Sequence, residues 1–317
     1  MTLRVGITGV SGDVGRGAVR GLRRNPPGAE PIWILGLDSS THRHPDVDEC
    51  MQLPLVREPG YADAVQAAVI HHGVEVLLPC IDSEIVVLSA ARGLFAGAAA
   101  RVVLAPCPLI KAAADKLATA HFLAARGIST PATFDTAAAV DALGLPIVAK
   151  PRSGHGSRGV KVLRDRVGLQ EFLAEPPPNY CLQRYIAGPE FTVGFLYDAH
   201  GVMQDAVAME RTLDDGRTVR ASVVDNPDMR RFIAAFGERV PGLGAVNAQL
   251  RWDDNDGPLV FEINARLSGS TEMRVAVGCN DPLRLVRHFG RGDSIARAQP
   301  QMATVHRRGS ELRVDPC

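Results

Sequence analysis

The sequence predicts an α/β unit followed by α+β units, and three observations support this prediction. Over roughly the first 106 residues, short apolar strands alternate with helical segments, which favours a parallel sheet. Residues 109–127 are strongly helical and end at Gly127. From Glu190 onward several strands follow one another closely, a spacing typical of antiparallel pairing. A chain of 317 residues has room for two or three packed units.

The elements of the first unit follow from hydrophobic periodicity and turn residues. In chain order we expect a strand at 3–9, a helix that begins at a glycine-rich turn, a strand at 31–38, a helix at 61–73, and strands at 74–80 and 100–106. Asp82 and Ser83 are candidates to cap the helix that follows Cys80.

The second half is expected to be richer in strands. These are predicted at 145–151, within 152–163, at 180–186, 190–198, 202–211, 218–225, 244–252 and 258–264, with helices at 226–239 and 271–278.

Composition limits the classes of partner. Lys plus Arg equals Asp plus Glu, 35 each, so net charge gives no case for nucleic acid or a membrane. None of the six cysteines forms a Cys-x-x-Cys pair, which favours reduced thiols in the cytoplasm. The start of the chain is typical of a strand and not of a signal peptide, and no apolar run could span a bilayer.

The segment PLVFEINAR carries the most informative polar pattern. Glu262, Asn264 and Arg266 share one face if the strand continues that far. A carboxylate beside an amide oxygen suits Mg²⁺, and an adjacent arginine can hold a phosphate. If this strand pairs with NAQLRW, Gln249 lies beside Glu262. The alternative is a solvated strand face.

A lysine and a glycine-rich loop suggest phosphate binding. Lys150 ends an apolar strand, and the loop 153–159 follows it. Glycines let backbone N–H groups approach phosphate oxygens, and serines add hydroxyl donors. The spacing is not that of a Walker A motif, and a plain turn is the alternative. His155 and Arg158 face solvent or contact substrate on closure.

Two further segments are weak when taken alone. The run QRYIAGPEFTV forms a hinge that could offer backbone groups to adenine and the Glu190 carboxylate to ribose, but it is also an ordinary hairpin. Lys116, within AAADKLATA, is by itself a surface lysine.

Taken in order, these motifs resemble the ATP-grasp superfamily, and most closely its carbamoyl-phosphate-synthase-large-chain-like branch. The resemblance covers about residues 105–290. It implies a Rossmann-like pre-ATP-grasp domain at 1–108, linker helices and a lid subdomain at 109–185, and a larger antiparallel-sheet subdomain at 186–317.

The resemblance also implies roles for single residues. Arg266 and Lys150 would be catalytic, and Gln249, Glu262 and Asn264 would bind Mg²⁺, or Mn²⁺ in its place. ATP would be bound by Lys116, Lys150, Ser153, Gly154, Gly156, Ser157, Gln183, Tyr185, Ile186 and Glu190.

The sequence departs from the family pattern at two positions. Arg184 occupies a hinge position that is often acidic, and Gln249 stands where many ATP-grasp enzymes have an acid, which weakens one metal site. Arg211 is a further candidate to face the site. The single ATP-grasp unit argues against synthesis of carbamoyl phosphate itself.

The resemblance implies an ADP-forming carboxylate–amine ligase that acts through an acyl phosphate. Small carboxylate and amine substrates are the expected partners, bound near 10–15, 80–84 and 267–274, and a homodimer is compatible with this role. One alternative is a catalytically weak nucleotide sensor or partner subunit. Another is an NAD-dependent enzyme, because Gly9, Gly12, Gly15 and Asp38 resemble a dinucleotide fingerprint.

Overall fold

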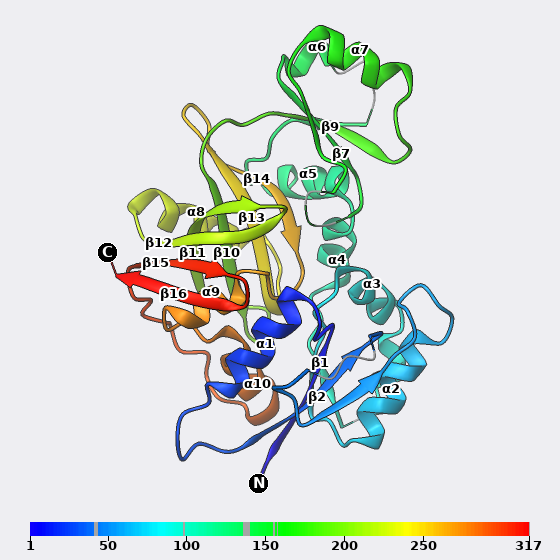
Figure 1. Ribbon diagram of the computed structural model, residues 1–317, viewed down its shortest axis with the longest axis vertical. Coiled ribbons are helices and arrows are strands. Elements are labelled where there is room, and N and C mark those ends of the chain that lie inside the picture. Colours follow the sequence, from blue (N-terminus) through cyan, green and yellow to red (C-terminus); the bar gives the residue numbers. More distant parts are fainter. Residues whose placement is uncertain (41–43, 98, 136–139, 155, 157, 317) are drawn as a thin grey trace.

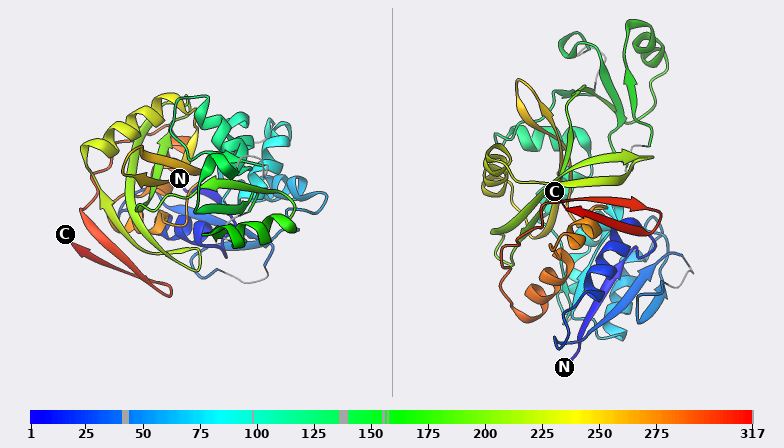
Figure 2. Two further views of the ribbon diagram at one scale, coloured as in Figure 1. Left: turned by 90° about the horizontal axis from the view of Figure 1, so that it is seen from above. Right: turned by 60° about the vertical axis from the view of Figure 1, so that its left-hand side comes forward.

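Three sheets make up the computed structural model, which describes residues 1–40, 44–97, 99–135, 140–154, 156 and 158–316. A parallel sheet lies at one end of the molecule and a small lid at the other, with a large antiparallel sheet between them (Figures 1 and 2). The predicted combination of an N-terminal parallel sheet with a larger antiparallel-sheet unit is confirmed.

The N-terminal sheet is parallel, with strand order β3-β2-β1-β4-β5. Its elements are β1 (Leu3–Thr8), α1 (Asp13–Arg23), β2 (Ile32–Asp38), β3 (Glu49–Gln52), α2 (Tyr61–His71), β4 (Val76–Leu78), α3 (Asp82–Ala90), a 3-10 helix (Arg92–Phe95) and β5 (Arg101–Val102). β3 was not predicted. The predicted cap of α3 is wrong: the helix begins at Asp82, and the buried Glu84 carboxylate accepts hydrogen bonds from the backbone N–H groups of Cys80 and Ile81.

The helical segment after this sheet is two helices and not one. α4 (Cys107–Ala113) and α5 (Lys116–Ala124) are separated at Asp115, whose side chain accepts hydrogen bonds from the backbone N–H groups of Leu117 and Ala118. Ser, Thr, Asp and Asn favour such N-cap positions. Asp115 also accepts a hydrogen bond from Arg152 at 2.9 Å, which ties the start of α5 to the base of the lid.

The lid has a four-stranded antiparallel sheet of order β6-β9-β7-β8 and its own hydrophobic core. Its elements are β6 (Thr133–Phe134), α6 (Val140–Leu143), β7 (Ile147–Pro151), β8 (Lys161–Leu163), α7 (Arg166–Ala174) and β9 (Tyr180–Arg184).

The large sheet is antiparallel, as predicted, with order β14-β13-β10-β11-β12-β15-β16. Its strands are β10 (Glu190–Tyr197), β11 (Met203–Asp214), β12 (Arg217–Val224), β13 (Gly244–Asp253), β14 (Gly257–Asn264), β15 (Ala303–Arg308) and β16 (Glu311–Pro316). Its helices are α8 (Pro227–Arg239), α9 (Thr271–Ala276) and α10 (Asp281–Arg291). The β15–β16 hairpin and α10 were not predicted.

The parallel sheet has a core on each face. α2 and α3 cover one face, and α1 and α10 cover the other (Figure 1). α10 therefore returns to the N-terminal sheet, where its Phe289 shares a core with Val5 and Ile7.

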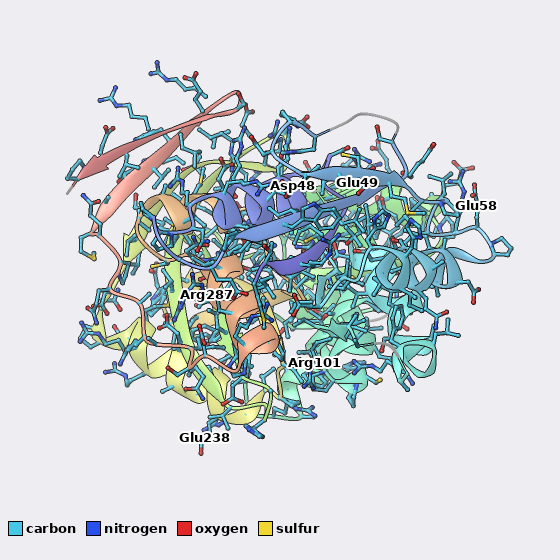
Figure 3. The ribbon with its side chains drawn as sticks, turned by 90° about the horizontal axis from the view of Figure 1, so that it is seen from below. Asp48, Glu49, Glu58, Arg101, Glu238 and Arg287 are labelled. Carbon is cyan, nitrogen blue, oxygen red and sulfur yellow. The ribbon has the colours of Figure 1, made fainter. Side chains whose placement is uncertain are left out.

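Charged side chains of both signs are interspersed on the surface. Asp48, Glu58, Arg101 and Glu238 are exposed, and Figure 3 shows Glu58 and Glu238 at the edge of the molecule. None of the helices in the described ranges is both long and apolar enough to cross a membrane.

Candidate active site

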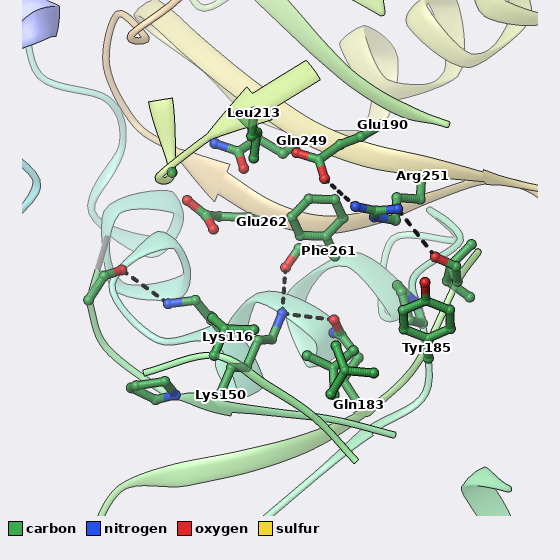
Figure 4. Close-up of a pocket in the computed structure, with 18 of the residues that line it drawn as sticks. Lys116, Lys150, Gln183, Tyr185, Glu190, Leu213, Gln249, Arg251, Phe261 and Glu262 are labelled. Carbon is green, nitrogen blue, oxygen red and sulfur yellow. Dashed lines mark hydrogen bonds and ion pairs between the residues drawn. The ribbon is translucent and has the colours of Figure 1, made fainter. Parts of the chain in front are cut away.

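A pocket of about 260 Å³ lies between the lid sheet and the large sheet (Figure 4). The predicted residues found in its lining are Lys116, Lys150, Ser153, Gly154, Gly156, Gln183, Tyr185, Ile186, Glu190, Gln249 and Glu262. Arg158 and Arg211 line it too. Ser157 and His155 fall outside the described residues. Asn264 and Arg266 are not part of the lining but continue from it through hydrogen bonds.

Lys150 is the most deeply buried cation of the pocket. It lies on β7, and its Nζ donates hydrogen bonds to Gln183 Oε1 at 2.8 Å and to the Phe261 carbonyl oxygen at 3.4 Å (Figure 4). The strand pairing places Gln249 opposite Glu262 but Leu250 opposite Val260, so Phe261 is an extra residue in a β-bulge. Burial lowers the pKa of Lys150 to about 8.

The glycine-rich loop closes one side of the pocket. Lys116, the first residue of α5, donates a hydrogen bond from Nζ to the Gly154 carbonyl oxygen at 3.1 Å. Gly154 and Gly156 have positive φ angles of 130° and 66°, which few other residues tolerate. A Cβ on Gly216 would lie 2.4 Å from the Gly156 carbonyl oxygen, so the β11–β12 hairpin touches this loop.

The hinge between lid and large sheet is held by arginines. Glu190 Oε1 accepts hydrogen bonds from Arg211 Nε at 2.9 Å and Nη2 at 2.7 Å. Its Oε2 accepts one from Arg251 Nη2 at 2.7 Å. Arg251 also donates to the carbonyl oxygens of Ile186 and Gly188, at 3.5 Å and 3.1 Å. The carboxylate predicted to meet ribose is therefore fixed by two guanidinium groups.

The polar end of the pocket follows the predicted register. Gln249 is opposite Glu262, which confirms the expected pairing. Asn264 Nδ2 donates to Glu262 Oε1 at 3.0 Å, and Arg266 Nη2 donates to Asn264 Oδ1 at 2.7 Å. Arg266 follows the end of β14 and forms an ion pair with Asp82 of the N-terminal unit. Burial opposes the charged form of Arg266, but Asp82 holds the pKa of its guanidinium above the usual range.

The described residues offer only one type of metal site here. No three His, Cys, Asp or Glu side chains among them gather around a possible metal position. A cation at this end would therefore depend on the Glu262 carboxylate, on amide oxygens and on ligand phosphates. Within the described ranges Glu262 forms no salt bridge, and Asn264 Oδ1 keeps one lone pair free of Arg266, so both fit Mg²⁺. Gln249 Oε1 accepts a hydrogen bond from Arg211 at 2.8 Å.

The pocket as a whole suits a bulky anion with an aromatic part. Of the described residues, six basic side chains and two acidic ones line it. Apolar walls come from Val148, Val160, Val162, Leu213 and Phe261.

The sequence patterns did not identify every residue that shapes this pocket. Arg251 had a signal, because strand alternation puts it on the same face as Gln249. Phe261 had none, because a bulge is a property of the pairing, and nothing near Asp82 in the sequence indicates Arg266 as its partner.

Contacts within the N-terminal unit hold the glycine-rich turn that follows β1. Asp38 accepts hydrogen bonds from the backbone N–H groups of Ser11 and Ser40, both at 2.9 Å. A Cβ on Gly15 would lie 2.3 Å from the Gly9 carbonyl oxygen, so the helix packs tightly on the turn.

Comparison with known proteins points to one superfamily. Residues 177–309 match a family model described as ATP-grasp in the biosynthetic pathway with Ter operon. The chain is 30% identical over 227 residues to the uncharacterized protein y4rH of Sinorhizobium fredii, covering 62% of this chain and 46% of that one. It is 34% identical over 192 residues to a D-alanine–D-alanine ligase of Gloeobacter violaceus, covering 52% and 62%. It thus spans less than two thirds of these relatives.

Solved structures share the fold over nearly the whole chain. The N5-carboxyaminoimidazole synthetase from Staphylococcus aureus in complex with ADP has a TM-score of 0.76 at 14% identity, with 96% of this chain and 82% of that one covered. An L-amino acid ligase from Bacillus licheniformis has a TM-score of 0.70 at 18% identity, with 96% and 78% covered. These matches do not test the carbamoyl-phosphate-synthase-like branch, which stays a prediction.

Proposed function

Because the chain belongs to the ATP-grasp superfamily, we propose that it is an ADP-forming ligase that joins a carboxylate to an amine through an acyl phosphate. One observation carries this proposal: the basic pocket between lid and large sheet ends in the bonded series Glu262, Asn264 and Arg266. A site of this kind joins a phosphate-binding end to a carboxylate-binding end.

The nucleotide would lie with its adenine between the apolar walls and against the backbone of Tyr185 and Ile186. Glu190 borders the ribose side, fixed by Arg211 and Arg251. Lys116, Lys150 and the 153–159 loop would then hold the phosphates with their N–H and hydroxyl donors.

Glu262 and Asn264 would hold Mg²⁺, which when bound supplies positive charge to the phosphate oxygens. Arg266 takes the role of a catalytic residue, because a guanidinium can stabilise charge on a transferring phosphoryl group and orient a carboxylate with two donors. Its Nε is buried without an acceptor in the described part of the chain, so this donor is free for a ligand.

The reaction balances with the groups named. The substrate carboxylate oxygen attacks the γ-phosphorus, the bond from that phosphorus to the bridging oxygen breaks, and ADP leaves. An amine nitrogen then attacks the acyl carbon, the bond to the phosphate oxygen breaks, and the amine loses a proton. Lys150 and Arg266 stabilise the phosphate charges in both steps, as phosphoryl transfer depends mainly on positioning and electrostatics. Loop closure excludes water from the acyl phosphate.

The test has a binding arm and a turnover arm. Mg·ATP at about 100 times its Kd should stabilise the chain by about 2.7 kcal/mol, seen as a rise in Tm. Amino acids and other carboxylates, each with an amine, are then screened for release of phosphate and ADP. Glu262→Gln should abolish release, whereas Glu210→Gln, an exposed change on β11, should not.

Two outcomes of the thermal measurements would contradict the proposal. A chain whose Tm responds to neither Mg·ATP nor Mg·ADP does not bind the nucleotide, and a Tm that responds to NAD alone would favour the alternative of an NAD-dependent enzyme. Full turnover by Glu262→Gln would remove the metal assignment. We also propose that the enzyme acts in the cytoplasm, where its free cysteines would stay reduced.

A further inference from the structure

Arg211 contacts a residue that the resemblance implies as a metal ligand. That residue is Gln249, which was expected to bind Mg²⁺ together with Glu262 and Asn264. Its Oε1 instead accepts a hydrogen bond from Arg211 Nη2 at 2.8 Å, and the Arg211 side chain is only 10% exposed.

The strand register explains why Arg211 lies there. Glu190 on β10 is opposite Arg211 on β11 and Arg251 on β13, so three charged side chains form one row across three strands. Gln249 is two residues before Arg251 on β13 and therefore points to the same face. The residue opposite Gln249 is Glu262 on the neighbouring strand β14. The guanidinium of Arg211 thus reaches from one row into the next.

The charges in this row do not cancel. Glu190 accepts hydrogen bonds from both arginines, which leaves this row with one positive charge in excess; the Glu262 carboxylate opposite Gln249 belongs to the next row. A carboxylate at position 249 could balance a divalent cation next to Arg211. The neutral amide of Gln249 cannot balance such an ion. A Mg²⁺ ion bound to Gln249 would be repelled by the positive guanidinium of Arg211, and the low-dielectric surroundings would strengthen this repulsion.

We propose that Arg211 takes the place of the second metal ion: it supplies the positive charge to the nucleotide phosphates, and the site holds a single divalent cation on Glu262 and Asn264. This inference rests on the proposed function, because it assumes that the pocket binds ATP. Gln249 then serves to hold Arg211 in place. The guanidinium of Arg211 holds its N–H donors in a fixed plane that suits phosphate oxygens, whereas a hydrated metal ion has no such fixed donors.

The inference is tested by counting bound Mn²⁺ with electron paramagnetic resonance in the presence of a non-hydrolysable ATP analogue. The wild-type chain should bind one Mn²⁺ per nucleotide site. The double variant Arg211→Gln with Gln249→Glu removes the guanidinium and restores an acidic ligand, and it should bind two. Arg211→Lys keeps the positive charge and should still bind one.

Variants at this position are expected to fold, because Glu190 keeps Arg251 as a partner when Arg211 is removed. Arg211→Gln alone should weaken binding of the analogue about 10- to 100-fold, because charge-assisted hydrogen bonds to the phosphates are lost. Arg220→Gln, at an exposed position of β12, is the matched control and should change neither affinity nor Mn²⁺ count.

Two Mn²⁺ ions in the wild-type chain would overturn the inference, as would a double variant that gains none. Failure of the proposed function gives a different result, since the analogue would then not bind at all. Stabilisation by the analogue in a thermal melt, measured before the metals are counted, separates the two cases.

Discussion

The depressed pKa of Lys150 makes nucleotide affinity depend on pH. Burial disfavours the ammonium form and lowers this pKa to about 8, whereas a bound phosphate favours the ammonium. The free pocket therefore has to be protonated before it binds. With a pKa of about 8, the ammonium fraction falls from about nine-tenths at pH 7 to about one-tenth at pH 9. Affinity for Mg·ATP should fall about tenfold over this range, and by about tenfold for each further pH unit.

The measurement is isothermal titration calorimetry from pH 6.5 to 9.5, in buffers of different ionisation enthalpy so that bound protons can be counted. Near pH 8 about half a proton should be taken up for each nucleotide bound. Lys150→Met should bind about 10- to 100-fold more weakly at pH 7 and lose the pH dependence. Lys116→Met should weaken binding but keep the dependence. Affinity that stays constant or rises with pH, or a dependence that survives in Lys150→Met, would refute the reasoning.

Three other substitutions test different contacts. Gly194→Ala should lower the free energy of unfolding by about 1–3 kcal/mol, because the new Cβ would lie 2.5 Å from Cζ of the fully buried Arg274. Glu84→Leu should lower it by about 3 kcal/mol, because the two backbone N–H groups and two hydroxyl groups that donate to this buried carboxylate would lose their acceptor. Arg251→Met should raise the KM for ATP about tenfold with kcat nearly unchanged, because the hinge loses its anchor before and during reaction alike.

Chemical denaturation measures the first two effects and steady-state kinetics the third. Gly93→Ala is the control for Gly194→Ala, because its Cβ would enter open space, and it should change stability by less than about 0.5 kcal/mol. Wild-type stability in Glu84→Leu would contradict the role given to this carboxylate as an acceptor. A fall in kcat without a change in KM would contradict the role given to Arg251.

Local patterns were enough to predict most strands of both major sheets, but not β3, β15 or β16. Alternation and apolar runs located β13 and β14, and the condition that they pair was enough to bring Gln249 beside Glu262. This worked because the side-chain period of a strand is fixed, so that one register determines a whole face.

Features that depend on distant contacts could not be predicted. Asp115 interrupts a helix whose flanking residues all favour helix, because its carboxylate also meets Arg152 of the lid. The ion pair of Arg266 with Asp82 joins residues 184 positions apart. The hydrogen bond from Arg211 to Gln249 depends on where two strands that are not neighbours lie in the sheet.

The position of α10 has a consequence for the order in which the chain can fold. The strands of the parallel sheet are synthesised first, but one of their faces is covered by α10, which is made nearly last. Gly290 lies so close to Leu3 that a Cβ there would be 2.8 Å from its side chain. We expect a nascent chain that ends before α10 to expose Val5 and Ile7 and to recruit chaperones, so the N-terminal unit should not be obtained by expressing it alone.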